Sequence, residues 1–245
     1  MNICVLAHYF PARSETFILE HVLGVRRRGH RVLVIAREAD PTVPASELAK
    51  LDAMGIERVY VGRFASPKIN RVRGLLASLR MPVLRPHFVG VNDDVRQDAL
   101  VALAESLAIR RWRPDVVHIH YGDHASNLLG MAGGLVDPAH CIVTWHGYDI
   151  NAEPIVAYHS GYARLLGLPI RHSVGSQFVR NRIEALGARS SAISVVPMGI
   201  DLERFAFRPR CYRQGEELRL LSVGRLEPVK GHALLIAAVS RLRAE

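Results

Sequence analysis

Cysteine is scarce in this chain. Its three cysteines, Cys4, Cys141 and Cys211, lie far apart, and no CxxC pair is present. A structural zinc site built on thiolates is therefore not indicated. Because Cys4 and Cys141 stand in apolar, strand-like runs, we expect both to be reduced core residues and not parts of a disulfide framework. This cysteine usage favours a cytoplasmic protein.

Several signatures of other protein classes are missing. No GxGxxG follows the first apolar run, which argues against a nicotinamide-dependent dehydrogenase. No GxxxxGK[ST] loop indicates ATP hydrolysis, and no GxSxG elbow indicates a serine nucleophile. No apolar run approaches the length of a membrane span. The opening, MNICVLAHYFP, has neither the basic region nor the cleavage site of a signal peptide, and we expect it to be a strand.

Lysine is also rare, yet the chain is basic. Lys and Arg number 32 against 23 Asp and Glu, which gives a formal net charge of +9 carried mostly by arginine. Such a surface favours anionic partners: phosphates, acidic lipid headgroups or nucleic acid. In the basic stretch at residues 67–87, aromatic residues are not interleaved with the basic ones, so a nucleic-acid stacking surface is not expected there. Residues 67–87 form a basic amphipathic segment that can lie on an anionic membrane surface, although an ordinary surface helix explains the pattern more simply.

Short apolar runs alternate with helical patterns along most of the chain, which is typical of βα units and a mainly parallel sheet. The expected strands are residues 2–7, 31–36, 58–61, 116–120, 141–145, 173–175 and 193–196. The expected helices include residues 46–54, 97–110, 125–131, 155–166 and 177–186, together with a first helix capped by Ser14. Ser176 is expected to cap the last of these. The predicted fold is α/β, with a doubly wound sheet.

The predicted organisation is one large domain followed by the start of a second. The first domain covers residues 1–200, a mixed linker covers 201–216, and residues 217–245 begin again with a strand at 218–223 and a helix at 232–243. A single βα unit cannot bury its own faces. We therefore expect the second domain to be incomplete.

The loop SVGRLEPVKGH joins the last predicted strand to the last helix. Gly224 and Gly231 let backbone approach an anion closely, and the helix start offers free N–H groups. Arg225 can grip phosphate oxygens with two hydrogen bonds, and Lys230 adds a point charge. These residues indicate a diphosphate site; the spacing alone is equally compatible with a solvated basic loop.

This loop resembles the G-R-L-x-x-x-K-G motif of glycosyltransferase family 4, and further segments of the chain resemble that family in the same order. They are HYFPARSETF near the start, HIHYGDHAS, TWHGYDI and VVPMGIDLERF. The first of these is similar to members that build exopolysaccharides such as colanic acid. The resemblance implies a GT-B fold with a Rossmann-like N-terminal domain and retaining transfer from a nucleotide diphosphate sugar.

The resemblance also implies roles for individual residues. Arg225 and Lys230 would bind the donor diphosphate, and His146 would contact the donor sugar. A single histidine is more often a buried one satisfied by backbone, but its place at a strand end favours a site. The predicted lining of the cleft consists of Arg13, Ser14, Glu15, His120, Gly122, Asp123, Gly147, Asp149 and Gly199.

For two parts of the predicted cleft lining, alternative interpretations remain open. The loop before the first helix, with Glu15, fits a helix start as well as it fits a phosphate or acceptor site. His118, His120 and His124 form an H-x-H-x-x-x-H pattern that could hold a metal ion if the imidazoles converged. No thiol partner is present and Asp123 is the sole nearby carboxylate, so we interpret the three as polar lining and expect no metal.

The expected partners are a nucleotide-sugar donor and a saccharide or lipid-linked saccharide acceptor, with contact to the inner face of an anionic membrane and no nucleic acid. In the family, the second domain also carries two glutamates separated by seven residues, and this chain has no match for them. We therefore expect little or no turnover by these 245 residues alone. The alternative is an inactive remnant that binds an acceptor or a membrane surface.

Overall fold

The computed structural model describes residues 1–62, 92–131, 134–200, 202–203, 205–209, 211, 213 and 215–244. The basic amphipathic segment at residues 67–87 lies outside this range. The chain divides into two compact units, Met1–Gly199 and Ile200–Glu245. The linker predicted at 201–216 falls at the start of the second unit.

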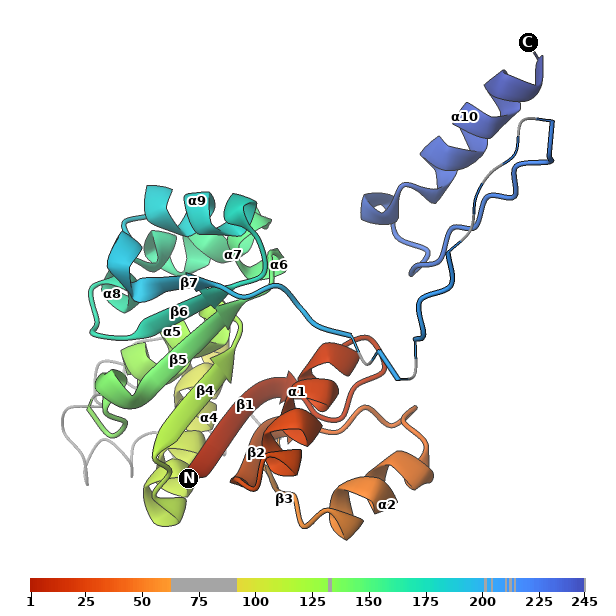
Figure 1. Ribbon diagram of the computed structural model, residues 1–245. Coiled ribbons are helices and arrows are strands. Elements are labelled where there is room, and N and C mark those ends of the chain that lie inside the picture. The colour runs from red at the N-terminus through yellow and green to blue at the C-terminus, as the bar shows by residue number, and fades with distance from the viewer. Residues whose placement is uncertain are drawn as a thin grey trace. The chain divides into compact units, whose positions relative to one another are not determined.

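The first unit is built on a seven-stranded parallel sheet in the order β3-β2-β1-β4-β5-β6-β7 (Figure 1). Its strands are β1 (Asn2–Tyr9), β2 (Arg31–Glu38), β3 (Glu57–Tyr60), β4 (Val116–His120), β5 (Cys141–Trp145), β6 (Arg171–Val174) and β7 (Ile193–Val195). All seven lie within one or two residues of the predicted strands. The α/β class and the doubly wound, Rossmann-like sheet predicted for a GT-B-type N-terminal domain are confirmed.

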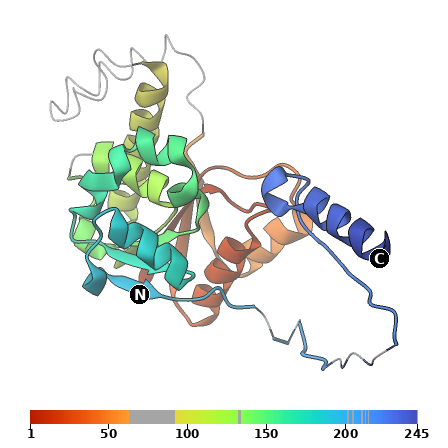
Figure 2. The ribbon, with the colours of Figure 1, turned by 90° about the horizontal axis from the view of Figure 1, so that it is seen from above.

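Helices connect the strands and cover the sheet. They are α1 (Thr16–Arg27), α2 (Ala45–Ala53), α4 (Asp93–Trp112), α5 (Gly122–Met131), α6 (Tyr148–Asn151), α7 (Glu153–Tyr158), α8 (Ala163–Leu166) and α9 (Gln177–Ala185). Short 3₁₀ turns lie at Pro138–His140, Ser160–Tyr162 and Ser190–Ala192. The view from above separates α1 and α2 from the helices that follow β4 (Figure 2).

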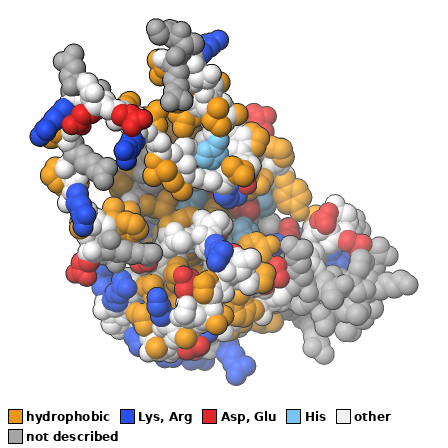
Figure 3. All heavy atoms as spheres, turned by 90° about the vertical axis from the view of Figure 1, so that its right-hand side faces the viewer, with side chains coloured by type: hydrophobic (Ala, Val, Ile, Leu, Met, Phe, Trp, Pro, Cys, Tyr) orange, Lys and Arg blue, Asp and Glu red, His pale blue; other side chains and the backbone are white. Residues whose placement is uncertain are grey.

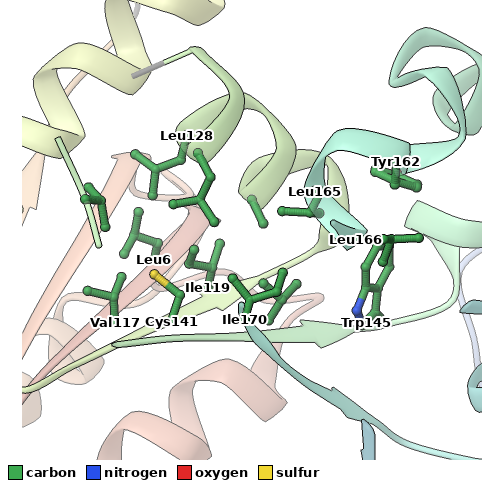
Figure 4. Packing of buried hydrophobic residues seen from close by; sticks show 14 of the residues in the cluster. Leu6, Val117, Ile119, Leu128, Cys141, Trp145, Tyr162, Leu165, Leu166 and Ile170 are labelled. Atoms are coloured by element: carbon green, nitrogen blue, oxygen red, sulfur yellow. The ribbon is translucent and has the colours of Figure 1, made fainter. Parts of the chain in front are cut away.

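Two hydrophobic cores form on opposite faces of the sheet, because successive side chains of a strand point to opposite faces. In β1, Cys4 and Leu6 face the larger core, and Val5 and Ala7 face the smaller one. The larger core packs against α4, α5, α8 and α9, and Figure 4 shows its centre around Ile119. The smaller core packs against α1 and α2. Cys4 and Cys141 are buried free thiols, as predicted.

Strand β4 contributes to only one of these cores. Val117 and Ile119 are buried in the larger core, whereas His118 and His120 alternate with them and point to the face that carries α1. Thr144 of β5 is in register with His120 and shares this polar face. The same period of two that builds the core therefore lines up polar side chains beside α1.

The chain direction across the sheet reverses between β1 and β4. From β1 the chain runs outward to β2 and β3, then crosses back to pair β4 with the free side of β1. In open parallel sheets, ligands bind outside the carboxyl ends of the strands at such a switch point. The topology therefore directs attention to the loops after β1, β4 and β5.

Helix starts follow side-chain capping at some predicted positions. Ser176 accepts a hydrogen bond from the Val179 N–H at 3.3 Å, so it caps α9 as expected. Ser14 does not cap α1: the residue before that helix is Glu15, and its side chain makes no cap bond because it reaches across to Tyr121. The helix predicted at 155–166 is broken, since Gly161 adopts a left-handed conformation within it.

The described part of the second unit contains the helix α10 (His232–Ala244), preceded by a 3₁₀ turn at Pro228–Lys230. The strand predicted at 218–223 is wrong, because the structure assigns no strand to these residues. A strand needs a neighbour to accept and donate its backbone hydrogen bonds, and the described part of this unit offers none. Accordingly, Leu218, Leu220 and Val223 are more than half exposed.

Candidate functional site

The loops after β1, β4 and β5 come together at the carboxyl edge of the sheet, because β4 pairs with both β1 and β5. Residues 10–15 follow β1 and lead into α1. Tyr121 follows β4 and is anchored by its N–H, which donates to the Thr144 carbonyl at 2.9 Å. His146 directly follows β5. Loops distant in sequence are thus joined at the switch point.

Four imidazoles lie in contact at and below this edge: His21 of α1, His118 and His120 of β4, and His146. We call them the histidine cluster. His120 Nδ1 lies 2.9 Å from His146 Nε2, and His120 Nε2 lies 3.3 Å from His21 Nδ1. His118 Nε2 lies 2.6 Å from the Thr144 hydroxyl, and its ring stacks on His120 with centroids 4.8 Å apart. A chain of hydrogen-bonded rings therefore runs from His146 inward to His21.

Burial keeps these imidazoles neutral. Burial, together with the charge that neighbouring histidines would carry, lowers the pKa of His118 to about 3 and that of His146 to about 4. The same two causes hold the pKa of His120 well below its usual value, and burial lowers that of His21. At neutral pH each ring can donate one hydrogen bond and accept another.

Asp149 holds the loops after β4 and β5 together. Its Oδ2 accepts from the Gly122 N–H at 2.8 Å, and its Oδ1 accepts from the N–H groups of His146 and Gly147 at 3.1 and 2.9 Å. Burial raises its pKa to about 6 against the opposing pull of these donors. Asp149 is fully buried, so the structure places it beneath the predicted lining and not on it. It fixes the backbone from which His146 projects.

The local packing at Gly122 and the backbone conformation at Gly147 both require glycine. A Cβ on Gly122 would lie 2.0 Å from the ring of Trp145, which is buried in the larger core directly beneath α5. Gly147 has φ = 96°, a conformation that other residues adopt only with strain. Both glycines were predicted as cleft lining. Their positions show that they let the backbone turn tightly around Trp145 and His146.

Two acidic side chains lie close to the loop after β1. Tyr121 donates its hydroxyl to Glu15 Oε1 at 2.9 Å, and His8 Nε2 contacts Asp123 Oδ2 at 3.1 Å. Glu15 Oε2 and Asp123 Oδ1 are buried and have no hydrogen-bond partner among the described residues. Burial raises the pKa of Glu15; in Asp123 the hydrogen bond and charge of His8 outweigh burial and lower the pKa to about 2. These two oxygens therefore keep unused capacity to accept a hydrogen bond.

The predicted grouping of His124 with His118 and His120 is wrong. His124 belongs to α5, where its Nε2 lies 2.9 Å from Glu105 Oε1, and both side chains are 1% exposed. Residues of a helix do not continue the alternation of the strand that precedes it. His124 therefore points to α4 and lies outside the histidine cluster, whereas His21 joins His118 and His120.

In the second unit, the predicted diphosphate loop is a compact turn. Gly231 has φ = 68° and ends the 3₁₀ turn, and a Cβ on Gly224 would lie 3.4 Å from Lys230 Cγ, so the lysine stem runs over this glycine. His232 ties the turn to α10, because its Nδ1 lies 3.0 Å from Ser222 Oγ and its Nε2 3.2 Å from the Arg225 carbonyl. The turn therefore brings the start of the Lys230 side chain beside the backbone of Arg225.

Arg225 is paired in this structure: its guanidinium contacts Glu227 Oε1 at 2.9 Å, with both side chains substantially exposed. Exposed pairs of this kind contribute little to stability. A more highly charged anion can therefore displace Glu227. Of the remaining predicted lining residues, Arg13, Ser14 and Gly199 are exposed.

Sequence reasoning missed three residues that the structure brings to the site. His21 and Phe17 lie one turn apart on the face of α1 that meets β4 and β5, and the Phe17 ring contacts His146 with centroids 4.6 Å apart. His8 lies in β1 and stacks on Tyr121. The signal available in the sequence was His21, a histidine that falls at helical spacing among apolar residues.

Charge is mixed on the molecular surface. On the face shown in Figure 3, Lys and Arg side chains are interspersed with Asp and Glu, and histidines are visible among hydrophobic side chains. The net charge of +9 is not gathered into one patch on this face. Among the helices that the structure describes, none is both long and apolar enough to cross a bilayer.

Comparison with known proteins places these features in a family. The chain is 25% identical to WcaL of Salmonella typhimurium, a glycosyltransferase assigned to colanic acid biosynthesis, over 96% of this chain and 59% of WcaL. It is 25% identical to the amylovoran biosynthesis glycosyltransferase AmsK of Erwinia amylovora, over 100% of this chain and 62% of AmsK. The chain thus spans about three fifths of the length of these relatives.

Among solved structures, a glycosyltransferase from Rickettsia africae aligns with 84% of this chain and 45% of its own, with 13% identity and a TM-score of 0.48. The model of Glycosyltransferase Family 4 matches residues 14–204, which include the loops after β1, β4 and β5. That match covers most of the chain. The chain therefore belongs to glycosyltransferase family 4.

Proposed function

We propose that this protein takes part in retaining transfer of a sugar from a nucleotide diphosphate sugar to a hydroxyl group of a saccharide, in the synthesis of a cell-surface or exported polysaccharide. The observation that carries the proposal is a neutral His146 at the carboxyl end of β5, beside the switch point, in a chain of this family. Similarity to WcaL and AmsK supports the polysaccharide class.

His146 would position the donor sugar by a hydrogen bond. Its Nε2 is engaged with His120, which leaves Nδ1 for a sugar hydroxyl. Because the ring is neutral at pH 7, it would orient the sugar without adding a charge. Packing against Phe17 and the hydrogen bonds of Asp149 to the loop backbone would hold the ring in place.

Arg225 and Lys230 would neutralise the diphosphate, which gains charge as the sugar leaves. Two cations and exposed N–H groups at a helix start meet this need, so we propose that transfer requires no metal ion. The contact of Arg225 with Glu227 would be exchanged for one with phosphate.

The acceptor would meet the first unit. Glu15 Oε2 and Asp123 Oδ1 are buried acceptors without partners among the described residues, and sugar hydroxyls are suitable donors to them. We propose that the acceptor is a saccharide or a lipid-linked saccharide bound through these carboxylates.

Calorimetric titration with UDP- and GDP-sugars tests the donor proposal. Arg225→Ala and Lys230→Ala should each weaken binding about 10- to 100-fold, because a hydrogen bond to a charged group contributes about 1.5–3 kcal/mol. Arg219→Ala is the matched control, since Arg219 is an exposed arginine of the same unit that lies near Glu217. Equal loss in all three variants, or no binding of any nucleotide sugar by the wild type, would contradict the proposal.

Turnover separates the enzyme from the alternative of a binding module. The binding module would be favoured by two results together. Glu15→Gln and Asp123→Asn would abolish acceptor binding, and a chain extended to the length of the relatives would show no transfer.

Contact with an anionic membrane is a further part of the proposal. Co-sedimentation with vesicles containing acidic lipids, lost at high salt, would support it, and equal co-sedimentation with neutral vesicles would contradict it.

A further inference from the structure

Three imidazoles of the histidine cluster converge in the way that metal ligands do. His118 and His120 project from the same face of β4, and His21 faces them from α1. One ring nitrogen from each lies within 4.8 Å of the other two. We propose that His21, His118 and His120 form a binding site for a divalent transition-metal ion of the zinc class.

The spacing is close to what a zinc ion needs. With Zn–N bonds of about 2.0–2.1 Å in tetrahedral geometry, ligand nitrogens lie roughly 3.3–3.4 Å apart. His120 Nε2 and His21 Nδ1 are 3.3 Å apart. The widest separation among the three nitrogens is at most 4.8 Å, so binding requires the third ring to approach by no more than about 1.5 Å. A side-chain rotation supplies a movement of this size.

Neighbouring groups orient the rings. The Thr144 hydroxyl lies 2.6 Å from His118 Nε2, and His146 Nε2 lies 2.9 Å from His120 Nδ1. Metal-bound histidines usually have their other nitrogen held in this way, which fixes the tautomer.

The ligand set selects the kind of metal. Imidazoles suit Zn²⁺, Co²⁺, Ni²⁺ and Cu²⁺, whereas Mg²⁺ and Ca²⁺ require oxygen ligands. Among the described residues, this group of three is made of histidines alone. The site would therefore bind zinc and ignore magnesium. The site belongs to the first unit, and it does not replace Arg225 or Lys230 of the second.

Metal binding would act on the proposed donor residue. If the metal takes His120 Nε2, the ring must keep its proton on Nδ1 and donate it to His146 Nε2. His146 would then carry its own proton on Nδ1. The effect on His146 as the donor-sugar residue rests on the proposed function, whereas the metal site itself does not.

The test uses the full chain, freed of metal by dialysis against a chelator. Calorimetry with Zn²⁺ should give one ion per chain, and Co²⁺ should produce the visible absorption of a tetrahedral complex. His21→Ala and His118→Ala should each weaken zinc binding more than tenfold and remove the cobalt band. The matched control His140→Ala removes an exposed histidine outside the cluster and should bind as the wild type does.

Thr144→Val provides a variant that keeps every ligand. It removes the hydroxyl that orients His118, and should weaken zinc binding about tenfold while the far- and near-ultraviolet circular dichroism stays unchanged. Mg²⁺ should give no heat. Absence of binding up to millimolar zinc, or equal binding by the wild type, Thr144→Val and both ligand variants, overturns the proposal and leaves the cluster as a hydrogen-bonded network. Nucleotide-sugar binding is measured separately, so failure here leaves the transferase proposal standing.

Discussion

At the scale of single residues, the site depends on buried groups that never reach its surface. Asp149 receives three backbone N–H bonds from two loops, and Trp145 donates its indole N–H to His172 Nδ1 at 3.2 Å beneath them. These contacts set where His146 projects. Changing them should alter stability and the site together.

Asp149→Asn should destabilise the protein by about 1–3 kcal/mol, because the new NH₂ group either faces the Gly122 N–H or leaves the His146 and Gly147 donors unpaired. Chemical denaturation measures the loss. Asp94→Asn, an exposed carboxylate in the first turn of α4, is the control and should cost less than about 1 kcal/mol. Equal stability of the two variants would show that Asp149 does not hold the loops.

His172 gives a prediction for pH. Burial, aided by Arg189, lowers its pKa to about 4. Between pH 6.5 and 4 the unfolded chain therefore binds a proton that the folded protein does not, so this contribution to stability is complete above pH 6.5 and falls as the pH falls. His172→Gln keeps an acceptor for Trp145 and does not titrate.

The free energy of unfolding of His172→Gln should consequently depend less on pH, by up to about 1.4 kcal/mol per pH unit in this window. Urea unfolding at pH 8, 7, 6 and 5 measures the slope for each protein. Above pH 7 the difference between wild type and variant should be constant, which serves as the internal control. Parallel slopes below pH 6.5 would contradict the role of His172.

Residues of the site could be predicted from the sequence where the residues that contact one another are close together in the chain. His118 and His120 share a face because they are two apart in a strand, and that follows from the sequence alone. His124 is four residues farther on, past the end of the strand, and the change to a helix at Gly122 turned it toward Glu105. His21 is 99 residues from His120, so its partnership depends on the packing of α1 across the sheet.

At the scale of elements, the start of α5 is shaped by the residue beneath it. A side chain on Gly122 would collide with the Trp145 ring at 2.0 Å, whereas Gly130 in the same helix has nothing within 4 Å of a Cβ. Gly122→Ala should therefore destabilise strongly, by about 1–3 kcal/mol or more. Gly130→Ala should be neutral or stabilising by up to about 1 kcal/mol, because alanine favours a helix.

Thermal unfolding of the two alanine variants, together with tryptophan fluorescence for the position of Trp145, provides the measurement. The pair is matched in substitution and in helix, so helix propensity cancels from the comparison. Similar melting temperatures for both variants would mean that Trp145 can move aside at little cost, and that α5 is not fixed by this contact.

Elements were predictable where the pattern and the packing agree. The central strands of the first unit are apolar runs bounded by turns, and each of the seven strands pairs with at least one neighbour. Residues 218–223 carry the same pattern but have no strand neighbour among the described residues of their unit, and they form no strand. Apolar periodicity reports a capacity to form a strand, and pairing decides whether one forms.

At the scale of the whole molecule, both hydrophobic cores are built from residues of the first unit. A chain ending at Gly199 should therefore fold alone and unfold in one transition within about 3 °C of the full chain, a difference that corresponds to roughly 1 kcal/mol at this size. Differential scanning calorimetry compares the two. A melting temperature lowered by ten degrees would show that residues 200–245 contribute to the stability of the first unit.

The central strand pair has a consequence for synthesis. Ile3 of β1 pairs with Val116 of β4, so one side of β1 has no partner until more than a hundred further residues have been made. At roughly 5–20 residues per second on the ribosome, this wait is on the order of ten seconds. During it, β1 can pair only with β2, and the open edge of a largely apolar strand is available to chaperones or to another nascent chain. The yield of native protein in cells should thus depend on translation speed between codons 60 and 120.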